Sequence, residues 1–339
     1  MASQTNAPLP DGLEIGGYRI VRRIASGGFS IVYLVEDEQG ESFALKEFLP
    51  SSLVRRRPGE LVAAVSESSE VTFRNGLKCF FEEGRALAKI FHPNVVRVLN
   101  FFRANETVYM VMAYEQGRSL QEIVLRHRSR SGVPVMPERH VARVFDPVMS
   151  GLREVHANRL LHLDIKPANI YIRMDGSPLL LDFGAARRGL DTDGPKLFPM
   201  YTPGFAAPEL YRRTLPRGPW SDIYSLGASM YACLTGAPPQ PADQRELDDQ
   251  ISPKLEKLIA DGSNAALIDL IAWCLKLNPI ERPQSVFTLQ RSLRRIALDK
   301  SEVGSKAAPQ TRKLRRWLDT IATRRSTESG DDASSTNSP

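Results

Sequence analysis

The feature that most constrains the fold is a change of hydrophobic periodicity near residue 118. Before this point, apolar and polar residues alternate in short segments separated by Gly-, Asp- and Gln-containing turns, at 18–25, 31–36, 42–48, 95–103 and 107–114. Such alternation predicts half-buried antiparallel strands. After it, apolar residues recur at helical spacing in 120–126, 138–158, 221–234 and 265–277, with two short apolar strands at 170–172 and 179–181. The sequence therefore predicts an α+β fold with a β-rich lobe followed by a mainly helical lobe.

The β-rich lobe is also expected to contain one main helix. Residues 49–70 break the strand pattern, and Phe80, Gly84, Leu87 and Phe91 then recur at helical spacing within 77–91. This spacing places the apolar side chains on one helix face and the acidic residues on the other.

Composition and charge narrow the class of protein. The chain of 339 residues is 42% hydrophobic and 25% charged, as in an ordinary soluble globular protein. Its three cysteines are widely spaced, which argues against a disulfide framework, and its five histidines show no zinc-ligand spacing. No signal peptide or membrane-spanning run is visible, so we expect a cytoplasmic location. The net charge of +6 is too small to indicate nucleic-acid binding.

Two features of the β-rich lobe are suited to phosphate binding. The small residues between the first two strands, within 24–32, let backbone N–H groups approach phosphate oxygens closely, although an ordinary hairpin turn has the same composition. Lys46 follows apolar residues on the third strand, where an ammonium is costly unless it is paired with anions. Glu83 is the expected counter-ion, and Glu82 is its neighbour and competitor.

The most informative motif is His-Leu-Asp-Ile-Lys-Pro-Ala-Asn at 162–169. It is followed 13 residues later by Asp-Phe-Gly at 182–184 and then by Ala-Pro-Glu at 207–209. In this order and spacing the motifs resemble the protein-kinase family over roughly 280 residues. The resemblance implies a two-lobed protein-kinase fold, with an antiparallel ATP-binding N-lobe above a helical substrate-binding C-lobe.

The resemblance also implies an activity and its cofactors. It implies phosphoryl transfer from ATP with Mg²⁺, in which Asp164 accepts or orients the proton of the acceptor hydroxyl and Lys166 stabilises the transferring phosphoryl group. Asn169 and Asp182 are the implied magnesium ligands, and Lys46 with Glu83 completes the catalytic set. The implied nucleotide-binding residues are Ile24, Ala25, Ser26, Gly27, Gly28, Ser30, Val32, Ala44, Lys46, Met112, Tyr114 and Tyr171.

Other matches concern architecture and subgroup. Glu209 and Arg282 resemble the paired ions that brace the family's substrate-binding segment, and Asp222 resembles the aspartate that anchors the catalytic-loop backbone. Lys166 and Thr202 are typical of the serine/threonine-directed branch, and the run at 49–53 is similar to a bacterial-type subgroup. The implied partners are protein substrates, with the chain itself among them.

The sequence departs from the family pattern at three places, and the departure in the glycine-rich loop keeps a second hypothesis open. Ala25 and Ser30 stand where the family has glycines, Leu163 replaces the arginine before the catalytic aspartate, and Tyr171 replaces a small aliphatic residue beneath adenine. The alternative is a pseudokinase that binds nucleotide and scaffolds a partner. A small-molecule kinase is disfavoured by the Ala-Pro-Glu element.

The expected domain organisation has three parts. Residues 1–17 form a flexible leader, and 18–298 form the kinase domain, divided into an N-lobe at 18–113, a hinge at 114–117 and a C-lobe at 118–298. Residues 299–339 form a basic, largely disordered tail. Within the tail, 311–325 has the pattern of a basic amphipathic helix that contacts a partner, the lobe itself or an anionic membrane surface.

Overall fold

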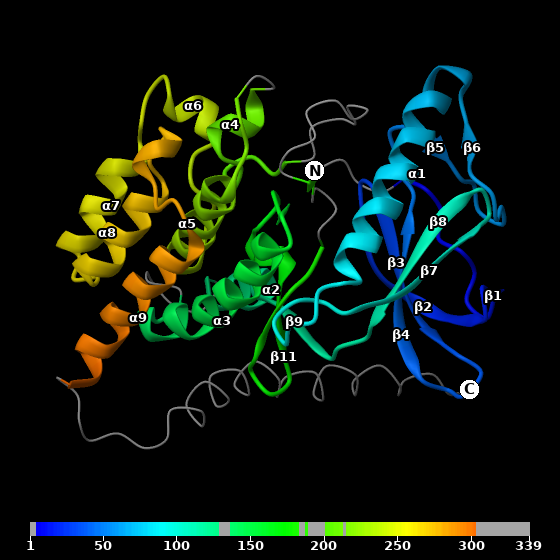
Figure 1. Cartoon of the computed structure of the whole chain (residues 1–339), viewed down its shortest axis with the longest axis horizontal. Helices are drawn as coiled ribbons and strands as arrows, with labels where there is room; N and C mark the ends of the chain where they lie inside the picture. The colour runs from blue at the N-terminus through cyan, green and yellow to red at the C-terminus, as the bar shows by residue number, and fades with distance from the viewer. Residues whose placement is uncertain (1–4, 129–135, 183–186, 189–200, 213–214, 303–339) are drawn as a thin grey trace, which may run out of the picture.

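The computed structural model describes residues 5–128, 136–182, 187–188, 201–212 and 215–302. Figure 1 shows two lobes, with the blue and cyan strands and helix α1 at one end of the molecule and the green to orange helices at the other. The two lobes are the ones that the change of periodicity predicts.

A six-stranded antiparallel sheet forms the N-lobe. Its order is β1-β2-β3-β4-β8-β7, and the long strands match the five predicted segments to within a few residues. The bounds are β1 Glu14–Ile15, β2 Tyr18–Gly27, β3 Ser30–Glu36, β4 Ser42–Phe48, β7 Val98–Ala104 and β8 Thr107–Ala113. A separate hairpin of β5 Val54–Arg55 and β6 Ala64–Val65 lies between β4 and the helix.

Helix α1 spans Glu67–Leu87, so the predicted start at residue 77 is wrong by ten residues. Ser66 adopts an extended N-cap conformation, and Glu67 and Glu70 lie in the first turn, where carboxylates favour the positive end of the helix dipole. The buried residues Phe73, Gly76, Phe80, Gly84 and Leu87 follow one face. The periodic pattern therefore begins earlier than the prediction allowed, because polar and charged residues mask its first two turns.

The C-lobe is mainly helical, as predicted. Its helices are α2 Leu120–Arg128, α3 Glu138–Ala157, α4 Pro208–Tyr211, α5 Pro219–Thr235, α6 Ala242–Arg245, α7 Ile251–Ala260, α8 Ala265–Cys274 and α9 Val286–Glu302. Helix α5 is the centre of this lobe, since nearly all of its residues are buried, and it packs against α3 and α8. Helix α5 ends at Thr235, and its C-cap residue Gly236 has a φ of 76°, a left-handed conformation that glycine adopts without strain.

Several short strands lie between β8 and α4 along the chain. They are β9 Gly117–Ser119, β10 Leu160–Leu161, β11 Ile170–Arg173, β12 Pro178–Leu180 and β13 Arg187–Arg188. Strands β12, β11 and β9 form one small sheet, and β10 pairs with β13. A 3₁₀ turn, η1 Pro167–Asn169, precedes β11, and a second, η2 Pro279–Glu281, precedes α9.

The structure differs from the expectation of a flexible leader at 1–17. Leu9 is 2% exposed, and the N–H of Ala7 donates a hydrogen bond of 3.0 Å to the carbonyl of Arg56. Apolar burial and backbone pairing thus hold residues 6–15 against the N-lobe sheet. The predicted helix at 311–325 lies outside the described residues. Among the helices that are described, none combines the length and apolarity needed to cross a bilayer.

Candidate active site

The motif at 162–169 follows β10 and ends with η1. Asp222, in the first turns of α5, binds the backbone at the start of this motif. The fully buried carboxylate of Asp222 accepts hydrogen bonds from the N–H groups of His162, at 2.9 Å, and Leu163, at 2.7 Å. Leu163 has a φ of 62°, a left-handed conformation that is unfavourable for a leucine and is held by these contacts. The anchoring role implied for Asp222 agrees with this geometry.

Two histidines complete this anchor. His156 Nε2 lies 2.8 Å from Asp222 Oδ2, and although burial raises the pKa of Asp222, hydrogen bonding from His156 lowers it below its ordinary value. Burial lowers the pKa of His162, so its ring is neutral. Its Nε2 then donates to the carbonyl of Leu181 at 3.0 Å, and its Nδ1 accepts from the N–H of Asp164 at 3.3 Å. The sequence did not indicate His156, because its neighbours on α3 mark only a helix face.

Asp164 lies at the centre of a polar cluster. Lys166 Nζ is 2.6 Å from Asp164 Oδ2 and 2.8 Å from the hydroxyl of Thr202, and that hydroxyl donates to Asp164 Oδ1 at 2.8 Å. The side-chain amide of Asn169 donates to the Asp164 carbonyl at 2.8 Å and to Oδ2 at 3.1 Å. The structure therefore brings Asp164, Lys166, Asn169 and Thr202 together from two segments of the chain. A carboxylate fixed in this way can orient a hydroxyl group and accept its proton.

Lys46 crosses from the N-lobe sheet to the C-lobe carboxylate Asp182. Its Nζ forms an ion pair with Asp182 Oδ1, and the Lys46 side chain is 8% exposed whereas that of Asp182 is 47% exposed. Burial would raise the pKa of Asp182, but the charges of Lys46 and Lys166 lower it to about 2. Asp182 therefore remains a carboxylate over the whole physiological range and is available to a cation.

The predicted pairing of Lys46 with Glu83 stays a prediction, because the ammonium is paired with Asp182 in this structure. Among the described contacts of Lys46, the ion pair is made with Asp182, and Glu83 is not within 4 Å. Burial lowers the pKa of Lys46, but the charges of Asp182 and Glu83 outweigh it and raise that pKa. Burial raises the pKa of Glu83 well above its ordinary value, and the attraction of Lys46 only partly opposes this. The ammonium has three donor hydrogens, so the ion pair with Asp182 leaves donors for a second acceptor.

Four of the predicted nucleotide-binding residues, Val32, Ala44, Lys46 and Met112, share one face of the sheet. Val32 is paired with Lys46, and Ala44 with Met112, so their side chains share the face that is turned toward α1 and Asp182. Residues 24–28 and 30 form the hairpin of β2 and β3 at the edge of this face, with Ala25 opposite Val32. The apolar half of the predicted site is therefore contiguous.

The remaining two predicted nucleotide-binding residues, Tyr114 and Tyr171, belong to the connection between the lobes. Tyr171 lies on β11 opposite Ser119, and Tyr114 follows β8. Burial, followed by the proximity of Tyr114, raises the pKa of Tyr171. Gly117 has room for no side chain, since a Cβ there would lie 2.1 Å from the carbonyl oxygen of Ile172. The same Cβ would lie 2.9 Å from Cε1 of Tyr171, so the Tyr171 ring packs closely on the backbone of Gly117.

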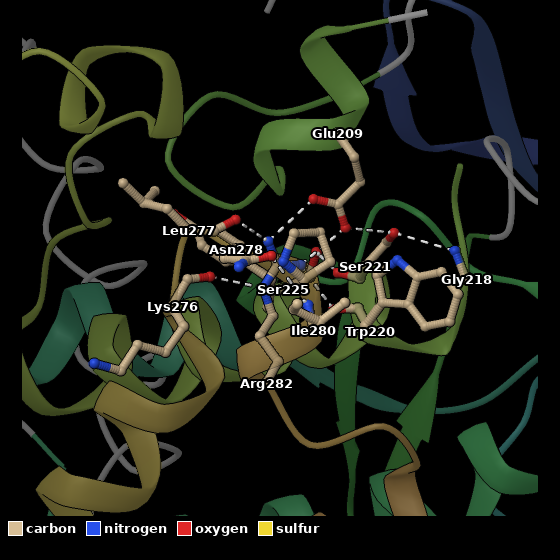
Figure 2. Close-up of polar contacts among 12 residues, drawn as sticks. Glu209, Gly218, Trp220, Ser221, Ser225, Lys276, Leu277, Asn278, Ile280 and Arg282 are labelled. Atoms are coloured by element: carbon tan, nitrogen blue, oxygen red, sulfur yellow. Dashed lines mark hydrogen bonds and ion pairs between the residues drawn. The ribbon is translucent and has the colours of Figure 1, made fainter. Parts of the chain in front are cut away.

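The segment after 201 is braced by a buried ion pair. Arg282 donates to both carboxylate oxygens of Glu209, at 2.8 and 3.0 Å, and both side chains are fully buried. Figure 2 shows this fork together with Ser221, whose hydroxyl donates to Glu209 at 2.7 Å. Arg282 also donates to the carbonyls of Lys276, Leu277 and Trp220, so its charge is fully satisfied.

Leu163 packs in a separate apolar cluster beneath the same segment. The cluster contains Leu161, Leu163, Ala206 and Leu210, and Tyr201 and Tyr211 pack against it. Phe183, Gly184 and Thr192 lie outside the described residues, but Leu160–Leu161 pairs with Arg187–Arg188. The apolar side chain of Leu163 therefore occupies the position at which the family pattern has an arginine.

Comparison with known proteins agrees with this geometry. The protein kinase domain model matches residues 18–293. A probable cell cycle serine/threonine-protein kinase, a CDC5 homolog of Encephalitozoon cuniculi, is 30% identical over 293 residues, covering 84% of this chain and 55% of its own length. The serine/threonine-protein kinase PknL of Mycobacterium tuberculosis is 29% identical over 303 residues, covering 86% of this chain and 69% of its own length.

Solved structures lead to the same family. The apo form of PpkA-294 superposes with a TM-score of 0.73 at 33% identity, covering 84% of this chain and 99% of that one. The PknI kinase domain of Mycobacterium tuberculosis has a TM-score of 0.61 at 23% identity and shows the fold alone. The chain spans about half the length of the CDC5 homolog and of murine Nek3, at 55% and 49%. Because the family model covers most of its residues, the chain belongs to the protein kinase family.

Proposed function

We propose that the chain is a serine/threonine protein kinase that transfers the γ-phosphoryl group of ATP to Ser and Thr hydroxyls of proteins, including its own. The observation that carries this proposal is the cluster of Asp164, Lys166 and Thr202, joined by hydrogen bonds of 2.6 to 2.8 Å. This cluster supports the proposal, because an acceptor hydroxyl needs a carboxylate and a transferring phosphoryl group needs a cation close to each other.

The proposed reaction assigns one role to each of these groups. The acceptor oxygen attacks the γ-phosphorus, the bond from the γ-phosphorus to the bridging oxygen breaks, and ADP leaves. Asp164 orients the hydroxyl and receives its proton, while Lys166 stabilises the negative charge on the phosphoryl oxygens. Lys46 binds the α- and β-phosphates, and Glu83 is proposed to position its ammonium.

Asn169 and Asp182 fit the chemistry of a magnesium site. The Asn169 amide nitrogen is used by Asp164, which leaves the amide oxygen as an acceptor, and Asp182 remains ionised. Mg²⁺ prefers such oxygen ligands and completes its shell with phosphates and water. No group of three His, Cys, Asp or Glu in the described ranges could hold a metal by itself, so the nucleotide would supply part of the shell. When bound, the ion neutralises charge on the phosphates.

The remaining assignments follow from the same proposal. Residues 18–113 would form the N-lobe, 114–117 the hinge and 118–298 the C-lobe, with Ile24 to Gly28 and Ser30 at the phosphates. Val32, Ala44, Met112, Tyr114 and Tyr171 would enclose adenine. We also propose a cytoplasmic role in signalling, with the tail at 299–339 outside the catalytic unit.

Incubation of the purified chain with γ-labelled ATP and a generic basic protein tests the proposal. Label on Ser or Thr of the basic protein and of the chain, lost when EDTA removes divalent metal, is the expected result. Binding of a fluorescent ATP analogue without transfer of label would instead support the pseudokinase alternative.

A further inference from the structure

The tip of the β2–β3 hairpin is tied to the segment that follows β4. Gly27 pairs with Ser30, so Gly28 and Phe29 form a two-residue tip. The N–H of Leu49 donates to the carbonyl of Phe29 at 2.8 Å. The carbonyl of Gly28 accepts from both the N–H of Ser51, at 2.8 Å, and its hydroxyl, at 3.1 Å. Three hydrogen bonds therefore fix the two carbonyls of the tip.

These bonds also set the direction of an N–H group. In a trans peptide the carbonyl and the following N–H point in opposite directions. With the Gly28 carbonyl held by Ser51, the N–H of Phe29 points away from the 49–51 segment. In the part of the chain that the structure describes, the N–H groups of Gly28 and Phe29 have no hydrogen-bond acceptor. They are donors available to a phosphate.

The tethering segment is in turn anchored by a buried ion pair. Arg56 Nη1 is 2.5 Å from Glu47 Oε1 and Nη2 is 2.8 Å from Oε2. The hydroxyls of Tyr33 and Tyr109 donate to the same carboxylate, each at 2.8 Å. Glu47 is 0% exposed and Arg56 is 2% exposed. A buried pair held by several hydrogen bonds has a fixed geometry, and removal of one partner leaves a buried charge.

This anchor lies on the face of the sheet opposite to Lys46. Adjacent residues of a strand point to opposite faces, and the ammonium of Lys46 lies over the ring of Phe80 on α1. Glu47 therefore faces the other side, where the N-terminal segment covers it. Arg56 donates from its N–H to Asn6 at 2.7 Å and from Nε to the carbonyl of Ala7 at 2.8 Å. One continuous set of contacts thus runs from residues 6–9 through Arg56 and the 49–56 segment to the hairpin tip.

We propose that residues 49–56, anchored by the Glu47–Arg56 pair, are a positioning element that holds the phosphate-binding hairpin in its binding geometry. The proposal rests on the proposed function, since it concerns the nucleotide of that reaction. The hairpin has Ala25 and Ser30 in place of two glycines. Its tip is held from outside by Ser51 and Leu49, and Glu47, Arg56 and Ser51 act on the nucleotide only through it.

The test uses three variants of the full chain. Ser51→Ala removes the hydroxyl contact at the tip. Glu47→Gln removes the negative charge of the Glu47–Arg56 pair at nearly constant side-chain volume. Glu36→Gln is the matched control, because Glu36 on β3 forms a 2.7 Å ion pair with Arg19 at the surface of the same sheet. The readouts are the Kd for Mg-ATP, kcat at saturating ATP, and amide hydrogen exchange at Leu49 and Ser51.

We expect the Kd for Mg-ATP to rise about twofold to fivefold in Ser51→Ala and about tenfold or more in Glu47→Gln. We expect kcat at saturating ATP to stay within about twofold of wild type. The amides of Leu49 and Ser51 should exchange faster in Glu47→Gln, and Glu36→Gln should match the wild type throughout. A purely structural role for the pair would lower the melting temperature without changing the Kd.

An unchanged Kd in a folded Glu47→Gln variant overturns the proposal. If Glu47→Gln does not fold, Ser51→Ala decides, and a wild-type Kd in that variant overturns the proposal equally. A wild-type chain that neither binds ATP nor transfers phosphate overturns the proposed function, and this proposal with it. Normal wild-type binding with unaltered variants overturns this proposal alone.

Discussion

The hydroxyl of Thr202 donates a hydrogen bond of 2.8 Å to Oδ1 of Asp164, although the two residues are 38 positions apart. The same hydroxyl accepts from Lys166 Nζ at 2.8 Å. Thr202 is therefore the group through which the segment after 201 fixes the orientation of the carboxylate and of the ammonium. Its role is that of a positioning residue.

Thr202→Val is expected to lower kcat about tenfold, because the isosteric side chain cannot make either hydrogen bond and about 1–1.5 kcal/mol of orientation is lost. Thr202→Ser keeps the hydroxyl and should retain activity within about threefold. Steady-state kinetics at saturating ATP checks both variants. A loss in Thr202→Ser equal to the loss in Thr202→Val would show that the hydroxyl alone does not account for the role of Thr202.

The apolar cluster at Leu163 predicts activity without a phosphate on the segment between 182 and 209. An arginine at this position would need an anion to neutralise it, whereas Leu163 is 4% exposed and packs with Ala206 and Leu210. Phosphatase-treated enzyme and Thr192→Ala are therefore expected to keep wild-type turnover within a few-fold. A loss of tenfold or more in either, about 1.4 kcal/mol of transition-state stabilisation, would contradict this reading of Leu163.

The Glu209–Arg282 pair is predicted to stabilise the C-lobe only as a complete unit. Arg282→Met leaves the buried Glu209 carboxylate with Ser221 as its remaining described partner and should lower the free energy of unfolding by about 3–5 kcal/mol. Arg294→Met breaks the exposed pair with Asp146 and is the control, with an expected change of at most about 1 kcal/mol. Urea denaturation measures both. Similar losses of unfolding free energy in the two variants would mean that the buried Glu209–Arg282 pair stabilises the fold no more than an exposed pair does.

The raised pKa of Glu83 predicts a pH dependence of stability. Burial keeps the proton on Glu83 in the folded protein above the ordinary value of 4.5, so the folded state binds more protons than the unfolded chain in this window. The contribution of Glu83 to stability is therefore present at low pH and is lost as the pH rises through the raised pKa. Glu83→Gln should raise the melting temperature relative to wild type at pH 8, and the difference should vanish near pH 4.

The exposed neighbour Glu82 supplies the control for this experiment. Glu82→Gln should show the same melting temperature as wild type across the pH range. A pH-independent difference between Glu83→Gln and wild type would mean that the pKa of Glu83 is the same in the folded and unfolded states.

Local patterns were sufficient to predict the elements with clear periodicity. The strand at 42–48 has the predicted bounds, and the helix predicted at 138–158 is observed at Glu138–Ala157. The strand lies between the turn at Gly40 and Pro50, and the helix has a buried apolar face, so local signals favour both elements. The motif at 162–169 likewise indicated which polar residues meet at Asp164, because their spacing is set within one short loop.

Contacts between residues that are far apart in the sequence could not be predicted from local patterns. The choice of Asp182 over Glu83 by Lys46 depends on how two lobes approach each other, which no spacing records. Glu47 and Arg56 are ordinary polar residues of the sequence, and only tertiary burial makes them an anchor. The packing of residues 6–15 depends on the same anchor, so the N-terminal segment was expected to be flexible.

The central claim is that Asp164 serves the transfer of phosphate rather than nucleotide binding. The most direct test is the rate of label transfer from γ-labelled ATP by Asp164→Asn, measured with the Kd for Mg-ATP of the same variant. We predict a loss of at least about a thousandfold in transfer with a Kd within about threefold of wild type, because the amide cannot accept the hydroxyl proton but retains the shape of the carboxylate. Transfer within tenfold of wild type at an unchanged Kd would contradict it.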